Sequence, residues 1–170
     1  MKKYLLVFVV FIFAFNGVLA QNLGELKSKV EKANKIFVEA MINSDFETMN
    51  SMYTENVISM PSYQPMIRGL NAIKEMGEMQ KQSGWSTKHF ALNMTDLIPA
   101  GSLTIEIGNY EIVMNMPDNT GEWSDNGKYI NVWETQEDDS LKIRVETWNT
   151  DTNPWENQGE EHYEEPEVLD

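Results

Sequence analysis

The stretch that decides the fold is Gly127-Lys128-Tyr129-Ile130-Asn131-Val132-Trp133, followed by Leu141-Lys142-Ile143-Arg144-Val145-Glu146-Thr147-Trp148. Both runs are rich in β-branched and aromatic residues, which strands favour. The polar segment Glu137-Asp138-Asp139-Ser140 between them is short enough to join antiparallel neighbours. We therefore predict a β-hairpin with strands over 127–137 and 141–150.

Two further extended segments precede this hairpin, at Thr87–Ile98 and Ser102–Met114. The break Pro99-Ala100-Gly101 separates them from each other, and the stretch over 117–126 separates them from the hairpin. Proline and glycine are the residues that most often punctuate regular structure. Four extended segments with short breaks predict an antiparallel meander.

The chain before residue 85 follows a helical period instead. Between Leu23 and Ile42 the apolar residues recur every three or four positions, as on a one-sided helix, at Leu26, Val30, Ala33, Phe37, Ala40 and Met41. Ser44-Asp45-Phe46-Glu47 reads as a capping box with serine at the cap, and it predicts a second helix. Its expected buried face is Phe46, Met49, Met52 and Tyr53.

A short strand and a third helix complete the predicted order. We expect the strand over Val57–Met60, closed by Pro61, and the helix after Arg68-Gly69, ended by Gly84. Helices followed by a meander predict an α+β domain with helices on one face of a curved sheet. Separate helical and β domains are excluded because neither half would bury enough apolar surface.

Several strings resemble one superfamily in their order and spacing. They are Asn43–Met49, Tyr53–Val57, the helix entry from Arg68-Gly69 to Ile73, and the final hairpin ending in Trp148-Asn149-Thr150-Asp151. The chain resembles the nuclear-transport-factor-2-like (NTF2-like), ketosteroid-isomerase-like superfamily, and its end is similar to the SnoaL-like (DUF4440) branch. The resemblance covers about residues 25–152. It implies a cone of three helices packed on a strongly curved antiparallel sheet, and it leaves the chemistry to be argued from the site.

The two ends of the chain differ in composition from the predicted domain. Lys2-Lys3, an apolar run from Tyr4 to Phe15 and small side chains at Val18 and Ala20 match a secretory signal peptide cleaved after Ala20. The run is shorter than the roughly 20 apolar residues of a membrane-spanning helix. Seven acidic residues and no Lys or Arg lie within 153–170. We expect a leader (1–20), a domain (21–152) and a disordered acidic tail (153–170), secreted or periplasmic and free of the membrane after cleavage.

Charge and composition exclude several partners. The chain has 27 acidic and 13 basic residues, and removing Lys2 and Lys3 with the leader changes the formal charge from −14 to −16. Such a surface repels nucleic acid, so no nucleic-acid partner is expected. No cysteine and only two histidines are present, so neither disulfides nor a zinc site nor another cofactor is expected. For His89 we expect a surface or hydrogen-bonded position, and for Asp118, Glu122 and Asp125 a polar hairpin loop rather than a calcium site.

The catalytic groups of a ketosteroid isomerase are not matched. That enzyme uses a carboxylate base and an oxyanion hole built from a tyrosine and a protonated aspartic acid. By the resemblance, the tyrosine's place falls on Phe37 and the base's place on Met60 or Pro61. None of these side chains can donate or accept a proton. Isomerase chemistry of this kind is therefore not expected.

The strands supply the candidate site residues. Along the last strand Leu141, Ile143, Val145 and Thr147 alternate with Lys142, Arg144, Glu146 and Trp148, and the alternation leaves open which row faces the helices. The resemblance implies a cone mouth lined by polar and aromatic side chains: Tyr53, Glu106, Tyr110, Tyr129, Asn131, Trp133, Glu146 and Trp148. Glu106 and Glu146 are the weak candidates for a catalytic base. Burial would raise the pKa of either unless it were paired, with Arg144 or Lys128 as the partner.

Three functions remain open from the sequence. The first is an exported module, expected as a homodimer, that binds a small apolar or carbonyl-containing ligand in its cone. The second is an isomerase-, dehydratase- or hydrolase-type enzyme that uses Glu106 or Glu146 as general base. The third is a dimeric interaction protein whose cavity is filled by its own side chains. An open cavity of several hundred cubic ångströms would favour the first two.

Overall fold

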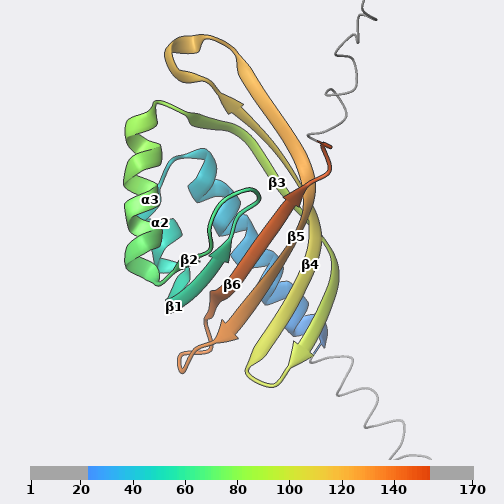
Figure 1. Cartoon of the computed structure of the whole chain (residues 1–170). Helices are drawn as coiled ribbons and strands as arrows, with labels where there is room; N and C mark the ends of the chain where they lie inside the picture. The colour runs from blue at the N-terminus through green and yellow to red at the C-terminus, as the bar shows by residue number, and fades with distance from the viewer. Residues whose placement is uncertain (1–22, 154–170) are drawn as a thin grey trace, which may run out of the picture.

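Helices cover one face of a strongly bent sheet in the computed structural model, which describes residues 23–153 (Figure 1). The predicted α+β fold is confirmed. The predicted leader (1–20) and residues 154–170 of the predicted tail lie outside the described residues. Within 23–153, no helix is long and apolar enough to cross a membrane.

The described residues form three α-helices, one 3-10 turn and six strands. The N-terminal helix is described over 23–42. The other elements are α2 (Phe46–Ser51), β1 (Tyr53–Met60), β2 (Ile67–Arg68), α3 (Leu70–Ser83), β3 (Ser86–Ala100), β4 (Leu103–Asn115), η1 (Pro117–Asn119), β5 (Glu122–Thr135) and β6 (Leu141–Thr150). The sheet order is β2-β1-β6-β5-β4-β3.

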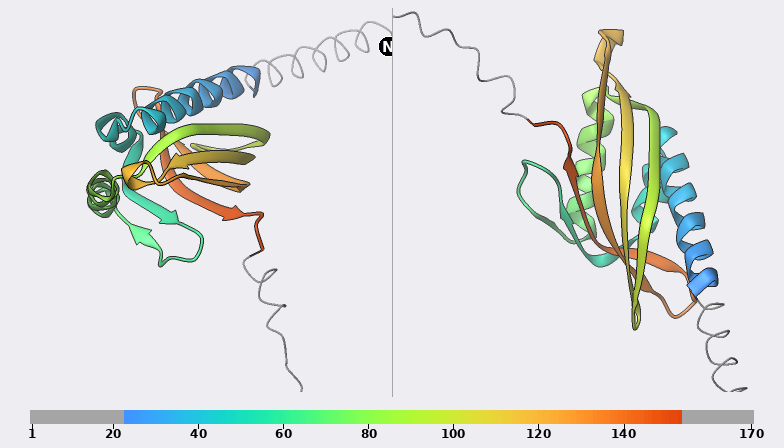
Figure 2. Two further views of the ribbon diagram at one scale, coloured as in Figure 1. Left: turned by 90° about the horizontal axis from the view of Figure 1, so that it is seen from above. Right: turned by 90° about the vertical axis from the view of Figure 1, so that its right-hand side faces the viewer.

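The sheet is antiparallel at every pairing except one. β1 runs parallel to β6, with Ser59 opposite Glu146. The long strands β3, β4 and β5 bend around the N-terminal helix, as the view from above shows (Figure 2). The first strand of the chain therefore lies beside the last, and the expectation of a wholly antiparallel sheet is corrected at this pair.

The start and the end of α2 differ from the prediction. The cap of α2 is Asp45, not Ser44, because the Asp45 carboxylate accepts hydrogen bonds from the backbone nitrogen (3.0 Å) and the hydroxyl (2.7 Å) of Thr48. Ser44 has a φ of 54° and precedes the helix. Tyr53 opens β1 rather than closing α2, since it pairs with Ile143 of β6.

The meander is longer than predicted at both of its turns. β3 continues through Pro99 to Ala100, which is compatible with proline because β3 is an edge strand. The chain then turns at Gly101, whose φ is 70°. β5 begins at Glu122, and its first residues extend the pairing with β4 as far as Asn115.

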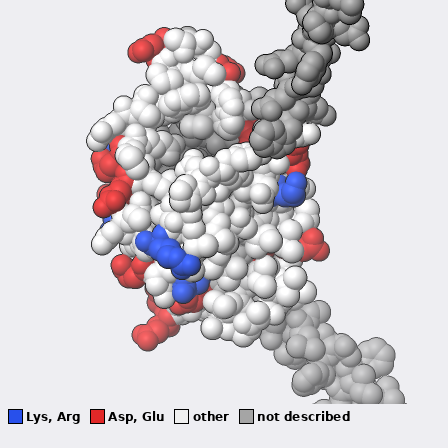
Figure 3. All heavy atoms as spheres, viewed as in Figure 1, with Lys and Arg blue, Asp and Glu red and all other residues white. Residues whose placement is uncertain are grey.

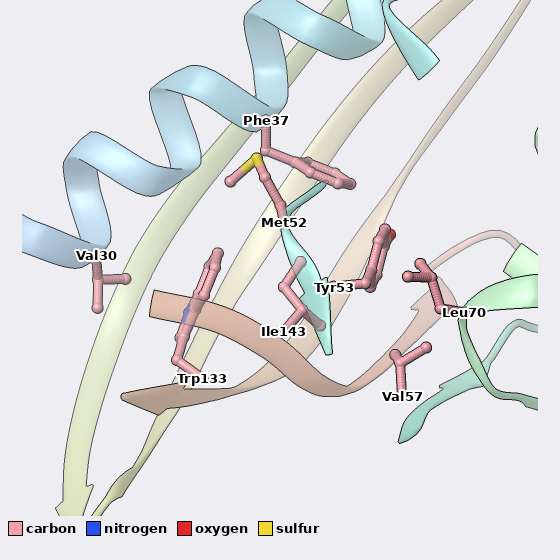
Figure 4. Packing of buried hydrophobic residues seen from close by; sticks show 8 residues of the cluster. All are labelled: Val30, Phe37, Met52, Tyr53, Val57, Leu70, Trp133 and Ile143. Carbon is pink, nitrogen blue, oxygen red and sulfur yellow. The ribbon is translucent and has the colours of Figure 1, made fainter. Parts of the chain in front are cut away.

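The core lies between the N-terminal helix and the middle of the sheet. Figure 4 shows Phe37 of that helix pointing toward Met52 and Tyr53, with Trp133 and Ile143 contributed by the sheet. The Phe37 ring packs edge-on against Tyr53, with ring centroids 6.2 Å apart. The predicted helix stripe is buried at Val30, Phe37 and Ala40, and it also buries a polar residue, Asn34.

Candidate ligand cavity

A β-bulge in β6 determines which side chains face the helices. Val132 pairs with Val145 and Trp133 pairs with Ile143, so Arg144 is an extra residue in β6. The extra residue shifts the alternation by one position. As a result Ile143 and Glu146 are both buried. Before the bulge the row that contains Ile143 faces the helices, and after it the row that contains Glu146 does, so each predicted assignment is correct for one half of the strand.

Beyond the bulge, the strands align a row of polar residues across the concave face. Glu106 of β4 is opposite Asn131 of β5, Asn131 is opposite Glu146 of β6, and Glu146 is opposite Ser59 of β1. All four are buried. Neighbouring strands lie about 4.8 Å apart, so two carboxyl groups far apart in the sequence share one band of the sheet.

Glu146 is held by hydroxyl groups rather than by a cation. The Ser59 hydroxyl donates to Oε1 at 2.7 Å and the Tyr53 hydroxyl donates to Oε2 at 3.0 Å. Burial raises the pKa of Glu146, and these two hydrogen bonds only partly oppose the rise. Burial and the neighbouring Glu146 raise the pKa of Tyr53 well above its ordinary value, so Tyr53 remains a donor at neutral pH.

Glu106 lies beneath the concave surface and links three elements. Its Oε1 accepts hydrogen bonds from Asn34 Nδ2 (2.5 Å) and the Tyr129 hydroxyl (2.7 Å), and its Oε2 accepts one from Trp133 Nε1 (2.7 Å). The side chain has no exposed area. Asn34 belongs to the N-terminal helix, so Glu106 fastens that helix to β4 and β5.

Two tyrosine rings lie over glycines of the facing strand. The sequence Gly-x-Tyr occurs at 108–110 in β4 and at 127–129 in β5, and the register sets Gly108 opposite Tyr129 and Tyr110 opposite Gly127. A Cβ at Gly108 would lie 2.7 Å from the Tyr129 hydroxyl oxygen, closer than real Cβ contacts. The missing side chains let both rings lie close to the sheet and leave space above them.

That space is a cavity of about 420 Å³ between the helices and the sheet. Its apolar wall includes Phe37, Phe90, Leu92, Ile112 and Met114, and its polar wall includes Glu146, Asn131 and Asp125. The remaining wall residues are Met41, Tyr53, Gln64, Gln80, Tyr110, Trp123, Tyr129, Thr147 and Trp148. Figure 3 shows the face on which the tip of the β4–β5 hairpin overhangs the rest of the molecule, with charged side chains mainly at its edges.

Solved structures identify the architecture, whereas no protein-family model and no curated protein sequence matches the chain. A ketosteroid isomerase-like protein from Erwinia carotovora atroseptica aligns with a TM-score of 0.65 and 10% identity, over 74% of this chain and 96% of that one. An NTF2-like superfamily protein from Salmonella enterica aligns with a TM-score of 0.66 and 11% identity, over 81% of this chain and 99% of that one. A Catenulispora acidiphila protein in complex with S-DNPA aligns with a TM-score of 0.63 and 15% identity, over 75% of this chain and 95% of that one.

The chain has the NTF2-like fold. The predicted resemblance is thereby confirmed at the level of architecture. At these identities the likeness concerns the fold, so the function has to come from the residues inside the cone.

In this NTF2-like cone the predicted site residues fall into two groups. Six of them line the cavity, namely Tyr53, Tyr110, Tyr129, Asn131, Glu146 and Trp148. Glu106 and Trp133 do not line it, because both are fully buried and Glu106 is enclosed by its hydrogen bonds to Asn34, Tyr129 and Trp133. Phe37 lines the cavity and Met60 does not.

The predicted cationic partners of the two glutamates are wrong. Arg144, the bulged residue, donates to the backbone oxygen of Asn56 and contacts Glu134 at 3.7 Å. Lys128 pairs with Asp151 at 2.6 Å, because it alternates with Tyr129 and points away from the cavity. Hydroxyl, amide and indole groups satisfy the carboxyls instead.

Sequence reasoning did not assign a role here to three polar side chains that form hydrogen bonds in this region. Ser59 and Asn34 bind the two glutamates, and Asp125 accepts hydrogen bonds from Tyr110 (2.6 Å) and Thr150 (2.5 Å). The sequence did contain a sign that Asn34 has a buried partner, since Asn34 is a polar residue on the apolar stripe of the N-terminal helix. Of the acidic loop considered for calcium, Glu122 pairs with Lys88. Among residues 23–153, no three His, Asp or Glu side chains group as metal ligands would.

Proposed function

We propose that this chain binds a small, largely apolar molecule with a carbonyl or similar acceptor group inside its cone. The observation that carries the proposal is a cavity of about 420 Å³ whose wall holds the buried carboxyl of Glu146. Ligand pockets of about 300–1,000 Å³ with apolar walls and a few polar groups are the usual form of small-molecule sites. A space of this size argues against the alternative of a cone filled by its own side chains.

Glu146 is suited to hold an acceptor because its buried carboxyl lines the cavity and because burial raises its pKa, which increases the fraction in the protonated form. A protonated carboxyl has one hydrogen-bond donor, and it can offer this to a ligand oxygen. Tyr53 and Ser59 fix the carboxyl from its other side. The apolar part of the ligand would lie against Phe90, Leu92 and the other apolar wall residues, and burying it would supply most of the affinity.

The test compares two probes that differ only in the carbonyl: 2-acetylnaphthalene and 2-ethylnaphthalene. Binding is measured by equilibrium dialysis. We expect 2-acetylnaphthalene to bind about tenfold tighter, the value of one hydrogen bond to a buried group. The variant Glu146→Leu should remove this preference. Glu111→Gln, on the exposed side of β4, is the control and should retain it. Absence of binding by both probes, or equal affinity for the two, would contradict the proposal.

A second candidate function is proton transfer, with Glu146 as the base. The observation in its favour is the perturbed pKa of an acidic group in a cavity, a property that functional sites share. Exchange of the methyl protons of 2-acetylnaphthalene in heavy water, followed by proton NMR, measures this activity directly. Exchange that is unchanged in Glu146→Gln would remove the catalytic candidate and leave the binding proposal intact.

Export and dimerisation belong to the same proposal. Lys2-Lys3 and the apolar run before Ala20 support export, and N-terminal sequencing of the protein from the cell exterior or periplasm would test cleavage after Ala20. Exposed apolar side chains on the sheet, Ile98 of β3 and Ile130 of β5, support a homodimer through the sheet. Analytical ultracentrifugation that finds only monomer would contradict the dimer.

A further inference from the structure

We propose that the ligand carries a positive charge, and that an organic ammonium group sits at the outer end of the cavity beside Asp125. The inference deepens the proposed function and rests on it. It concerns the opposite end of the cavity from Glu146, since Asp125 and Asn131 are six residues apart on β5, or about 20 Å.

The first observation is the sign of the charges on the wall. None of the described residues that line the cavity is Lys, Arg or His. Two are acidic: Glu146, whose carboxyl burial shifts toward the neutral acid, and Asp125. The whole chain carries a formal charge of −14, which raises the concentration of cations at its surface. An anionic ligand would meet repulsion and no compensating group.

The second observation is that Asp125 has no cationic partner within the described part of the chain. Its acidic neighbours do have one: Glu122 pairs with Lys88 at 2.5 Å and Asp151 pairs with Lys128 at 2.6 Å. Asp125 accepts only hydroxyl groups, from Tyr110 and Thr150, one on each oxygen. Each oxygen keeps a free lone pair, so the carboxylate is held in place without being neutralised.

The third observation is the aromatic surroundings of this carboxylate. Trp123 lies on the same face of β5, two residues before Asp125, and Tyr110 hydrogen-bonds to it. Trp148 lines the same cavity from β6. Aromatic faces attract cations, and rings grouped with a carboxylate are the usual receptor for quaternary ammonium groups. Burial and the hydrogen bond to Asp125 raise the pKa of Tyr110, so its ring stays a neutral phenol at neutral pH.

The experiment uses a cation and a neutral molecule of the same shape: (2-naphthylmethyl)trimethylammonium and 2-neopentylnaphthalene. Equilibrium dialysis of the full chain gives both dissociation constants. We expect the ammonium to bind about tenfold tighter, the effect of a carboxylate with aromatic faces in a partly desolvated site. Asp125→Asn should abolish the preference. Asp96→Asn, an exposed aspartate on β3, is the matched control and should preserve it.

The outcomes separate this inference from the proposed function. Equal affinity of the two naphthalenes for the wild type would overturn the cation site while leaving small-molecule binding in place. Absence of binding by these probes and by 2-acetylnaphthalene would remove both. If Asp125→Asn does not fold, added sodium chloride tests in the wild type whether the preference depends on charge. Salt should weaken binding of the ammonium and leave that of the neutral probe unchanged, and equal salt effects would contradict the site.

Discussion

The Tyr110 ring occupies the space that a side chain at Gly127 would fill. The two residues are directly opposite across β4 and β5, and a Cβ at Gly127 would lie 2.9 Å from Tyr110 Cε1. The same relationship repeats between Tyr129 and Gly108. The floor of the cavity is therefore built from two tyrosines, each resting on a glycine, and each ring direction depends on the opposite strand.

Replacing Gly127 with alanine should lower the free energy of unfolding by about 1–3 kcal/mol, because the new methyl group would overlap the backbone oxygen of Asn149 and crowd the Tyr110 ring. Gly24→Ala is the control. It lies in the N-terminal helix with nothing within 4 Å of the added Cβ, so stability should not fall. Urea denaturation measures both. A neutral Gly127→Ala would mean that the ring does not depend on the glycine.

Glu106→Gln should destabilise the fold by about 1–3 kcal/mol, since one amide nitrogen would then face groups that donate. Asn34, Tyr129 and Trp133 all donate to this carboxyl. The matched control is Glu111→Gln on the exposed side of the same strand, where no loss is expected. Thermal unfolding measures the stability of both variants. Equal losses of stability in the two would contradict the role of Glu106 as the link to the N-terminal helix.

Glu146 should make stability depend on pH in a defined direction. Its pKa in the folded state is raised above the ordinary value of 4.5, so the folded protein binds the proton more tightly than the unfolded chain does. That contribution is fully present below pH 4.5 and is lost as pH rises through the raised pKa. The free energy of unfolding of wild type relative to Glu146→Gln should therefore fall with rising pH. A difference that is flat from pH 4 to pH 8 would contradict the raised pKa.

Asp45→Ala should lower the melting temperature by a few degrees, because α2 would lose its cap. Hydrogen bonds from Thr48 lower the pKa of Asp45, so the cap persists above pH 3.8 and weakens as pH falls through the lowered value. Ser44→Gly is the contrasting variant. With φ at 54°, position 44 suits glycine, and stability should hold or rise. The opposite ranking would restore Ser44 as the cap.

The arrangement of the site was only partly predictable. Tyr129, Asn131 and Trp133 alternate on β5 and share a face as the pattern requires. The family resemblance placed Glu106 and Glu146 at the same cone mouth, yet it could not tell that only Glu146 would line the cavity. The difference comes from the N-terminal helix, because Asn34 lies over Glu106 and hydrogen-bonds to it.

The amino-acid sequence by itself determined the three helices, five of the six strands of the described residues and their order, because apolar spacing and turn residues act locally along the chain. Tertiary structure decided the rest. The bulge at Arg144, which brings both Ile143 and Glu146 inside, depends on pairing with β5 and β1. The partners of the buried carboxyls come from segments 23 to 93 residues away. Such contacts form only when the sheet closes against the helix, since no local pattern encodes which distant donor will face a given carboxyl.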